Sequence, residues 1–259
     1  MMFKNKIIWL TDLHIRADSA ADRIDPVRNL TVMVDDILRF HDDADAVLVT
    51  GDLTDSGAPE QYQIAAEALA PLPMPVLPIA GNHDTREGLR SAFPELGGGQ
   101  SDSIQYRVDI GDLTILCLDT LEQGDNGGTY GQTRLDWLEK TLGDCRRRRT
   151  IIAIHHPPLQ LGLGPLDTIA LRDPGPLLDL LSGADHIEHI LIGHVHRATT
   201  GTIRGIPYST LRSLSHQNRA PLTDWGWSEN RIPNEAPQYG VILSSPDSLV
   251  IQTIDLGSE

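Results

Sequence analysis

Five short apolar runs, each ending in aspartate, asparagine or histidine, constrain this 259-residue chain more than any other feature. The last run, residues 190–192, leads into Gly193 and then presents His194 and His196. Such a run predicts a buried strand, and residues i and i+2 of an extended segment point to the same side. The two imidazoles can therefore converge on one spot, which is most simply a metal site. The other runs cover residues 7–10, 46–50, 76–80 and 151–154, and they deliver Asp12 and His14, Asp52 and Asp55, Asn82 to Asp84, and His155 and His156.

The shared position of these polar residues carries more information than any one of them. In open α/β sheets, the carboxyl ends of the strands are where ligands bind, because the loops leaving them converge on a common crevice. Six of the ten histidines lie in these five blocks. We therefore expect the blocks to meet at one metal-binding crevice.

The rest of the chain reads as an α/β fold. Apolar spacing predicts helices at about residues 25–38, 59–69, 86–93, 132–142 and 176–181, and further strands at 104–108 and 113–118. After His196 the pattern changes to short β runs at 199–203, 207–211, 239–243 and 249–254, which we expect to form a second, antiparallel sheet. We predict a single domain over residues 1–259. Residues 205–240, with the tryptophan-bearing stretch 218–237, are a candidate lid or oligomer interface.

Composition excludes several classes of protein. A formal charge of −15 argues against binding long nucleic acid, because affinity for the phosphate backbone needs clustered lysine and arginine. No stretch approaches the roughly 20 apolar residues that span a bilayer. The two cysteines, Cys117 and Cys145, make a disulfide framework improbable and fit a reducing cytoplasm.

The five blocks together resemble the signature of calcineurin-like metallophosphoesterases. They read Asp12-x-His14, Gly51-Asp52-x-x-Asp55, Gly81-Asn82-His83-Asp84, His155-x-Pro157 and Gly193-His194-x-His196, in that order. The resemblance implies a four-layer αββα sandwich with two mixed β-sheets. It also implies a hydrolase that holds two divalent metal ions.

The resemblance further implies a role for each block residue. Asp12, His14 and His196 would hold the first ion, Asn82, His155 and His194 the second, and Asp52 would bridge them. Mixed carboxylate, amide and imidazole ligands suit Mn, Fe or Zn better than Mg. Asn82 and His83 would contact the phosphate, and His83 would stabilise or protonate the leaving oxygen. With Asp52 these two form the predicted catalytic set.

Residues around the blocks have supporting roles. We expect Asp55 and Asp84 to orient imidazoles. Of the adjacent histidines we assign the ligand role to His155, following the His-x-Pro pattern, and a supporting role to His156. His216 either faces the substrate or tethers its own loop.

The segment after Gly193-His194-x-His196-Arg197 is similar to that of class III cyclic nucleotide phosphodiesterases and bacterial glycerophosphodiesterases. This points to small phosphodiesters, with a 3',5'-cyclic nucleotide as the leading substrate. A glycerophosphodiesterase, or a broad-specificity phosphomonoesterase and phosphodiesterase, is the alternative. A non-catalytic scaffold would be expected to lack ligands, and none is missing here. A DNA nuclease is opposed by the negative charge, and a homo-oligomer is compatible with this branch.

Overall fold

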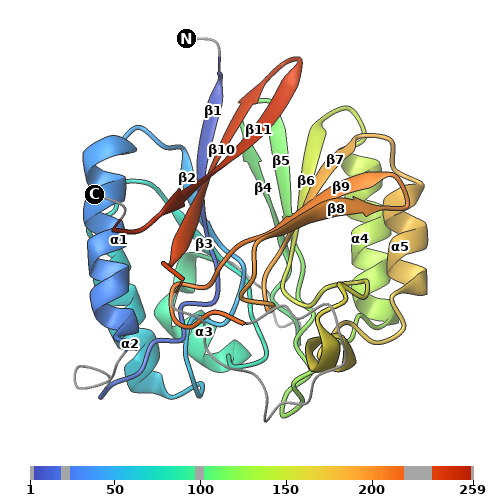
Figure 1. The fold of residues 1–259 in the computed structure, drawn as a ribbon. Coiled ribbons are helices and arrows are strands. Elements are labelled where there is room, and N and C mark those ends of the chain that lie inside the picture. The colour runs from blue at the N-terminus through green and yellow to red at the C-terminus, as the bar shows by residue number, and fades with distance from the viewer. Residues whose placement is uncertain (1–2, 19–23, 97–101, 219–234, 258–259) are drawn as a thin grey trace.

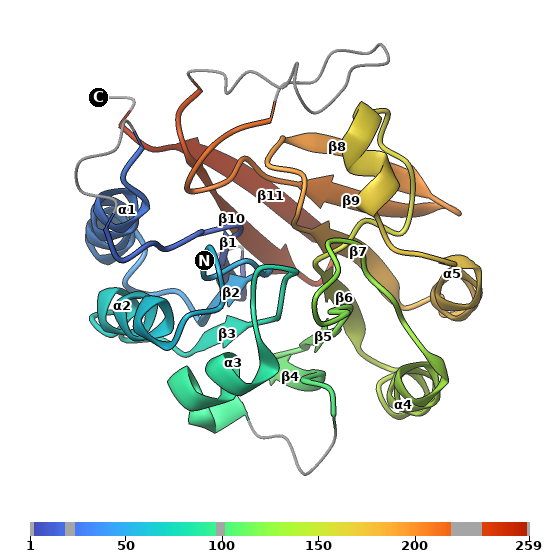
Figure 2. The same cartoon turned by 90° about the horizontal axis from the view of Figure 1, so that it is seen from below.

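Two β-sheets packed face to face, with helices on both outer faces, make up the fold (Figures 1 and 2). The computed structural model describes residues 3–18, 24–96, 102–218 and 235–257. The helices are α1 (Pro26–Phe40), α2 (Pro59–Leu69), α3 (Arg86–Ala92), α4 (Gln132–Asp144) and α5 (Gly175–Ser182), with 3-10 turns at Pro94–Leu96 and Gly164–Ile169. The strands are β1 (Asn5–Leu10), β2 (Ala46–Val49), β3 (Val76–Pro78), β4 (Tyr106–Ile110), β5 (Leu113–Cys117), β6 (Arg149–Ile154), β7 (Ile187–Ile192), β8 (Thr199–Ile203), β9 (Ile206–Thr210), β10 (Gln238–Ser245) and β11 (Ser248–Asp255).

The first sheet has the strand order β11-β10-β1-β2-β3, and the second has the order β4-β5-β6-β7-β9-β8. The pairs β1·β2 and β2·β3 are parallel, whereas β10 joins β1 antiparallel. In the second sheet β5, β6, β7 and β9 are parallel neighbours, and β4 and β8 are antiparallel edge strands. Both sheets are therefore mixed, and the predicted four-layer αββα sandwich is confirmed.

Alternation along the strands explains the layers. Ile7 and Trp9 of β1 pack in the core between the sheets, while Ile8 and Leu10 turn the other way, into the core under α1 and α2. On the far side, Leu116 of β5 packs into the core under α4 and α5. Because side chains of a strand point alternately to its two faces, a strand covered on both faces is apolar throughout. This is why the runs that precede the site residues are apolar at every position except Thr50.

The helices follow their sequence signals closely. Asp25 caps α1 by accepting hydrogen bonds from the backbone amides of Val27 and Arg28, and Pro26 occupies the first turn, as its fixed φ favours. The five predicted helices are confirmed, with ends that differ by a few residues. α1 and α2 lie on the outer face of the first sheet and α4 and α5 on that of the second, as Figure 2 shows.

One topological prediction is wrong. The four strands after His196 do not form a sheet of their own: β8 and β9 extend the second sheet from β7, and β10 and β11 extend the first sheet from β1. The strands that carry the five blocks are likewise divided between the two sheets instead of sharing one. The physical reason is that an apolar run records burial on both faces but not which edge it pairs with.

Two further expectations concern segments that the structure covers only in part. Within 205–240, Ile206–Thr210 is the sheet strand β9, while residues 219–234 lie outside the described residues. The expected lid or interface there stays a prediction, as does the single-domain organisation. Among the described residues, no helix has the length and apolarity that a bilayer crossing requires.

Candidate metal centre

All seven predicted ligands meet where the two sheets abut, at the carboxyl ends of five strands. β1, β2 and β3 of the first sheet lead to Asp12 and His14, to Asp52 and to Asn82, respectively. β6 and β7 of the second sheet lead to His155 and to His194 and His196. Every one of the imidazoles and carboxylates among them is buried.

The first donor group consists of Asp12, His14, Asp52 and His196, whose ligand atoms all lie within 4.8 Å of one another. His14 Nε2 lies 3.0 Å from His196 Nε2, and His196 Nε2 lies 3.4 Å from Asp12 Oδ1. His14 Nε2 is also 3.5 Å from Asp52 Oδ2. Two imidazole nitrogens and two carboxylates thus face one point, as a cation would require.

The second donor group is built around Asn82. Its Oδ1 lies 3.1 Å from His155 Nε2 and 2.9 Å from His194 Nδ1. His155 Nε2 is in turn 3.4 Å from Asp52 Oδ2. This is the oxygen that approaches His14 in the first group, so a single carboxylate oxygen joins the two groups.

Backbone carbonyls fix which imidazole nitrogen faces the centre. His155 Nδ1 donates to the carbonyl of Thr50 at 2.8 Å, and His196 Nδ1 donates to the carbonyl of His216 at 2.8 Å. Since a carbonyl oxygen can only accept, each Nδ1 carries a proton and each Nε2 is the nitrogen that faces the centre. The ring nitrogens are therefore set up as ligands before any ion binds.

The two buried carboxylates make the centre attract positive charge. Burial opposes ionisation of Asp12, but the nearby His196 and His155 outweigh it and lower the pKa of Asp12 to about 2. Burial likewise opposes a charged His155, yet the Asp52 carboxylate raises the pKa of His155 to about 9. Burial and the charge of His155 lower the pKa of His194 to about 3. A divalent cation would replace the protons that otherwise balance the two carboxylates.

The backbone at the centre is held in an uncommon conformation. Asp12, His14, Asp52, His194 and His196 all have positive φ angles, between 45° and 73°. In the described part of the chain, seven non-glycine residues have positive φ, and these five are among them. Left-handed backbone costs an L-residue about 1–2 kcal/mol. Five such residues in one site indicate that tertiary contacts impose this backbone conformation, which directs the ligand side chains toward one another.

His156 occupies the supporting position that the sequence predicts. Its Nδ1 pairs with the Thr120 hydroxyl at 2.8 Å and its Nε2 with the Asn126 carbonyl at 3.2 Å. Its ring packs against those of His155 and His194, with centroids 4.9 Å away in both cases. With both nitrogens engaged, His156 braces the two neighbouring rings.

His83 and His216 line the side of the centre next to His14. The His83 amide donates to Asp52 Oδ1 at 2.9 Å, and His83 Nδ1 donates to the Asp55 carbonyl at 2.7 Å. The ring of His216 lies 4.4 Å from that of His196 and 5.4 Å from that of His14. Both histidines therefore lie close enough to contact a molecule bound at the centre.

The two supporting aspartates differ. Asp55 Oδ1 lies 3.5 Å from His14 Nδ1, as expected of a residue that orients an imidazole. Asp84 instead accepts hydrogen bonds from the amides of Gly81, Leu53 and Thr54 and from two hydroxyls, so its predicted contact with an imidazole is wrong. The Asp84 carboxylate is buried between the two loops and binds their backbone amides.

Several contributors carry no signal in the sequence. The carbonyls of Thr50 and His216 orient ligands, but every residue has a carbonyl. Tyr62, which donates to Asp84, lies on α2 and outside all five blocks. Only the folded chain brings these groups next to the ligands or to the residues that support them.

The donor set fits divalent cations. The Nε2 atoms of His14 and His196, 3.0 Å apart, and carboxylate oxygens at 3.4–3.5 Å form a cage that is short of positive charge. Imidazole with carboxylate and amide oxygen is a ligand set typical of Mn, Fe and Zn. The shared oxygen of Asp52 fits a pair of ions better than one.

Sequence comparisons agree with this geometry. The family model described as "Calcineurin-like phosphoesterase" matches residues 5–198. A probable cyclic nucleotide phosphodiesterase of Rhodopseudomonas palustris is 33% identical over 95% of this chain and 90% of its own length. A 3',5'-cyclic adenosine monophosphate phosphodiesterase of Escherichia coli is 31% identical over 74% of this chain and 70% of its own. The glycerophosphodiester phosphodiesterase GpdQ of Enterobacter lignolyticus is 35% identical over 67% of this chain, which spans 63% of that relative.

Solved structures share the fold at low identity. A dimetal phosphatase from Danio rerio aligns with 98% of this chain and 100% of its own, with a TM-score of 0.76 and 14% identity. The TT1561 protein of Thermus thermophilus aligns with 97% of this chain and 99% of its own, with a TM-score of 0.60 and 13% identity. At these identities the likeness concerns the fold alone.

Proposed function

Because this chain belongs to the calcineurin-like phosphoesterase family, we propose that it is a two-metal phosphodiesterase acting on small diesters, with 3',5'-cyclic nucleotides as its substrates. The observation that carries the proposal is Asp52 Oδ2, which lies 3.5 Å from His14 Nε2 and 3.4 Å from His155 Nε2. One oxygen between two groups of donors is what a bridging ligand requires.

In this proposal each donor group holds one ion. Asp12, His14 and His196 would hold the first, Asn82, His155 and His194 would hold the second, and Asp52 would be shared by both. The ions, Mn, Fe or Zn, would neutralise phosphoryl oxygens and lower the pKa of a water that attacks phosphorus in line with the leaving oxygen.

The chain's own residues select a phosphodiester. Two divalent ions set against the carboxylates of Asp12 and Asp52 would leave the centre positive, which favours an anionic substrate such as a phosphodiester. The neutral Asn82 keeps that charge, which a third carboxylate would reduce. Asn82 and His83 contact the phosphate, and His216 borders the same space.

His83 is the proposed proton donor. Its Nδ1 is committed to the Asp55 carbonyl, so Nε2 is the nitrogen that delivers a proton to the leaving alkoxide. Its amide is anchored to Asp52, the residue shared by the two donor groups, and this holds the His83 imidazole beside His14.

The experiment is a substrate panel on protein stripped with a chelator and reloaded with Mn, Zn or Co. We expect hydrolysis of cyclic AMP and of bis(p-nitrophenyl) phosphate, and weaker hydrolysis of glycerophosphoethanolamine and p-nitrophenyl phosphate. Preference for glycerophosphoethanolamine would instead support the glycerophosphodiesterase alternative, which the GpdQ relative favours. Cleavage of single-stranded DNA would contradict the proposal, since the charge of −15 repels such a substrate.

A matched pair of variants links activity to the centre. Asn82→Ala is expected to lower diesterase activity on the order of 100-fold and to reduce the bound metal from two ions toward one. The control, Asn5→Ala, removes a buried asparagine at the start of β1, far from the centre, where it bonds Asp112. It should change neither the diesterase activity nor the metal content. Unaltered activity and metal content in Asn82→Ala would refute the assignment.

We also place the enzyme in the cytoplasm. Cys117 and Cys145 are both free and buried, as is usual for proteins of reducing compartments. Cyclic nucleotides formed in the cell would be accessible there.

A further inference from the structure

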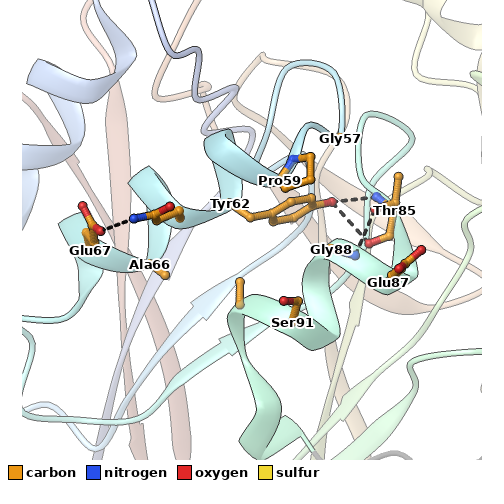
Figure 3. Close-up of a pocket in the computed structure, with 11 residues that line it drawn as sticks. Gly57, Pro59, Tyr62, Ala66, Glu67, Thr85, Glu87, Gly88 and Ser91 are labelled. Carbon is orange, nitrogen blue, oxygen red and sulfur yellow. Dashed lines mark hydrogen bonds between the residues drawn. The ribbon is translucent and has the colours of Figure 1, made fainter.

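Tyr62 of α2 reaches the loop that carries Asn82 from outside the metal centre. It lines a cavity of about 720 Å³ between α2 and α3, and its hydroxyl points toward Thr85, which lines the same cavity (Figure 3). The hydroxyl accepts a hydrogen bond from the Thr85 amide at 2.6 Å and lies 3.1 Å from Asp84 Oδ1, to which it donates. Tyr62 is 2% exposed, so these bonds are shielded from water.

Asp84 and Asp52 cross-link the two loops that follow β2 and β3. Asp84 accepts from the amides of Leu53 and Thr54, both at 3.2 Å, while Asp52 accepts from the His83 amide at 2.9 Å. Each loop thus contributes a carboxylate that binds amides of the other. Tyr62 is the third support of this cross-link, and it comes from a helix.

The cross-link holds a conformation that the local sequence does not favour. Asp52 has a φ of 50°, and the residues directly after it are the ones that Asp84 binds. Gly81, just before Asn82, approaches so closely that an added Cβ would lie 2.1 Å from Asp52 Oδ1. Conformations of this kind persist only where surrounding contacts impose them.

We propose that Tyr62 is a positioning residue for the donor group around Asn82, acting through Asp84 and the Thr85 amide. Its hydroxyl contacts Asp84 and Thr85, neither of which is an assigned ligand. These two residues lie at the end of the turn that presents Asn82, so removing the hydroxyl should loosen this group more than the one around His14 and His196. The inference rests on the ligand assignments of the proposed function.

The test is calorimetric titration of chelator-treated protein with Mn²⁺, with no substrate present. We expect Tyr62→Phe to bind one Mn²⁺ about as tightly as the wild type and the other on the order of tenfold more weakly, because the turn that presents Asn82 loses a support. Tyr239→Phe is the matched control, because it also removes a tyrosine hydroxyl, one that donates to Asp36 on α1. Its two dissociation constants should match those of the wild type.

A second variant displaces the Tyr62 hydroxyl instead of removing it. An added Cβ at Gly88 would lie 2.1 Å from the Tyr62 ring, so Gly88→Ala should shift the ring and weaken the same ion selectively. Circular dichroism of the metal-free variants verifies that each is folded.

The outcomes separate the two claims. Dissociation constants in Tyr62→Phe that both stay within about twofold of the wild type, or that rise equally, would overturn the inference and leave the proposed function standing. A wild-type protein that binds no Mn²⁺ would overturn both.

Discussion

At the scale of the single residue, His83 offers the sharpest test of chemistry. Its Nδ1 is held by the Asp55 carbonyl, so only Nε2 can exchange a proton with a substrate. His83→Ala should lower kcat for cyclic AMP by about 100-fold or more, because the departing alkoxide needs a proton. The p-nitrophenolate of bis(p-nitrophenyl) phosphate leaves without one, so its kcat should fall by less than about tenfold.

Steady-state kinetics on both substrates measure this difference. His186→Ala, a change near the opposite end of β7, is the control and should leave both rates unchanged. Equal losses on the two substrates would mean that His83 binds phosphate without donating a proton.

His189 makes a prediction about stability and pH. It bonds the Ser209 hydroxyl from a largely buried position, and burial lowers the pKa of His189 to about 4. In the unfolded chain this histidine has its ordinary pKa of about 6.5. Between these values the unfolded state takes up a proton that the folded state does not, so the free energy of unfolding falls as the pH drops from about 6.5 to 4.

Urea unfolding at several pH values measures this contribution. In His189→Gln the free energy of unfolding should depend less steeply on pH in that window, by up to about 1 kcal/mol per pH unit. Other histidines titrate in both proteins and cancel in the difference. Identical pH slopes in the two proteins would show that His189 is not held neutral.

The residues of the centre were predictable because their chemistry is local. Each ligand directly follows an apolar run, so the sequence names both its side chain and its place at the end of a strand. Asp84 was placed correctly but given the wrong partner, because the backbone amides that it binds have no signature in the sequence. Tyr62 was not predicted at all, since 22 residues separate it from Asp84.

At the scale of elements, Arg149 joins the two sheets at the end opposite the metal centre. It lies at the start of β6, is paired with Glu188 of β7, and donates to Ser244 and Ser248 of the β10–β11 hairpin in the other sheet. Its side chain is mostly buried, so these bonds are partly shielded from water.

Arg149→Met should therefore lower the free energy of unfolding by about 1–3 kcal/mol, the usual cost of removing a charged hydrogen-bond donor. Metal content should not change, because His155 lies at the other end of the strand. Arg107→Met is the control: its partner Asp109 is exposed, so the loss should stay within about 0.5 kcal/mol. Equal effects of the two changes in chemical denaturation would contradict this role for Arg149.

The limits of sequence reasoning at this scale lie in strand pairing. Periodicity located all eleven strands, yet it could not assign β8 and β9 to one sheet and β10 and β11 to the other. Bonds such as those from Arg149 to the β10–β11 hairpin contribute to that choice, and they join residues nearly a hundred positions apart.

At the scale of the whole molecule, the metal centre is itself a link between the sheets. The first sheet leads to Asp12, His14, Asp52 and Asn82, and the second leads to His155, His194 and His196. Ions bound by both sets would hold the sheets together in the folded state only. The separate ligand sets do not exist as cages in the unfolded chain, so metal binding should stabilise the fold by mass action.

Removal of the ions should consequently lower the thermal stability of the entire protein. At a free Mn²⁺ concentration of 100 times the dissociation constant, each ion contributes about 2.7 kcal/mol. For a chain of this size that amounts to a rise in Tm of about 5 °C or more per ion. Scanning calorimetry in excess Mn²⁺ and in a chelator measures the difference. Asp52→Ala, which removes the shared ligand, should lose most of it, whereas equal Tm values for the wild type under both conditions would mean that no ion bridges the sheets.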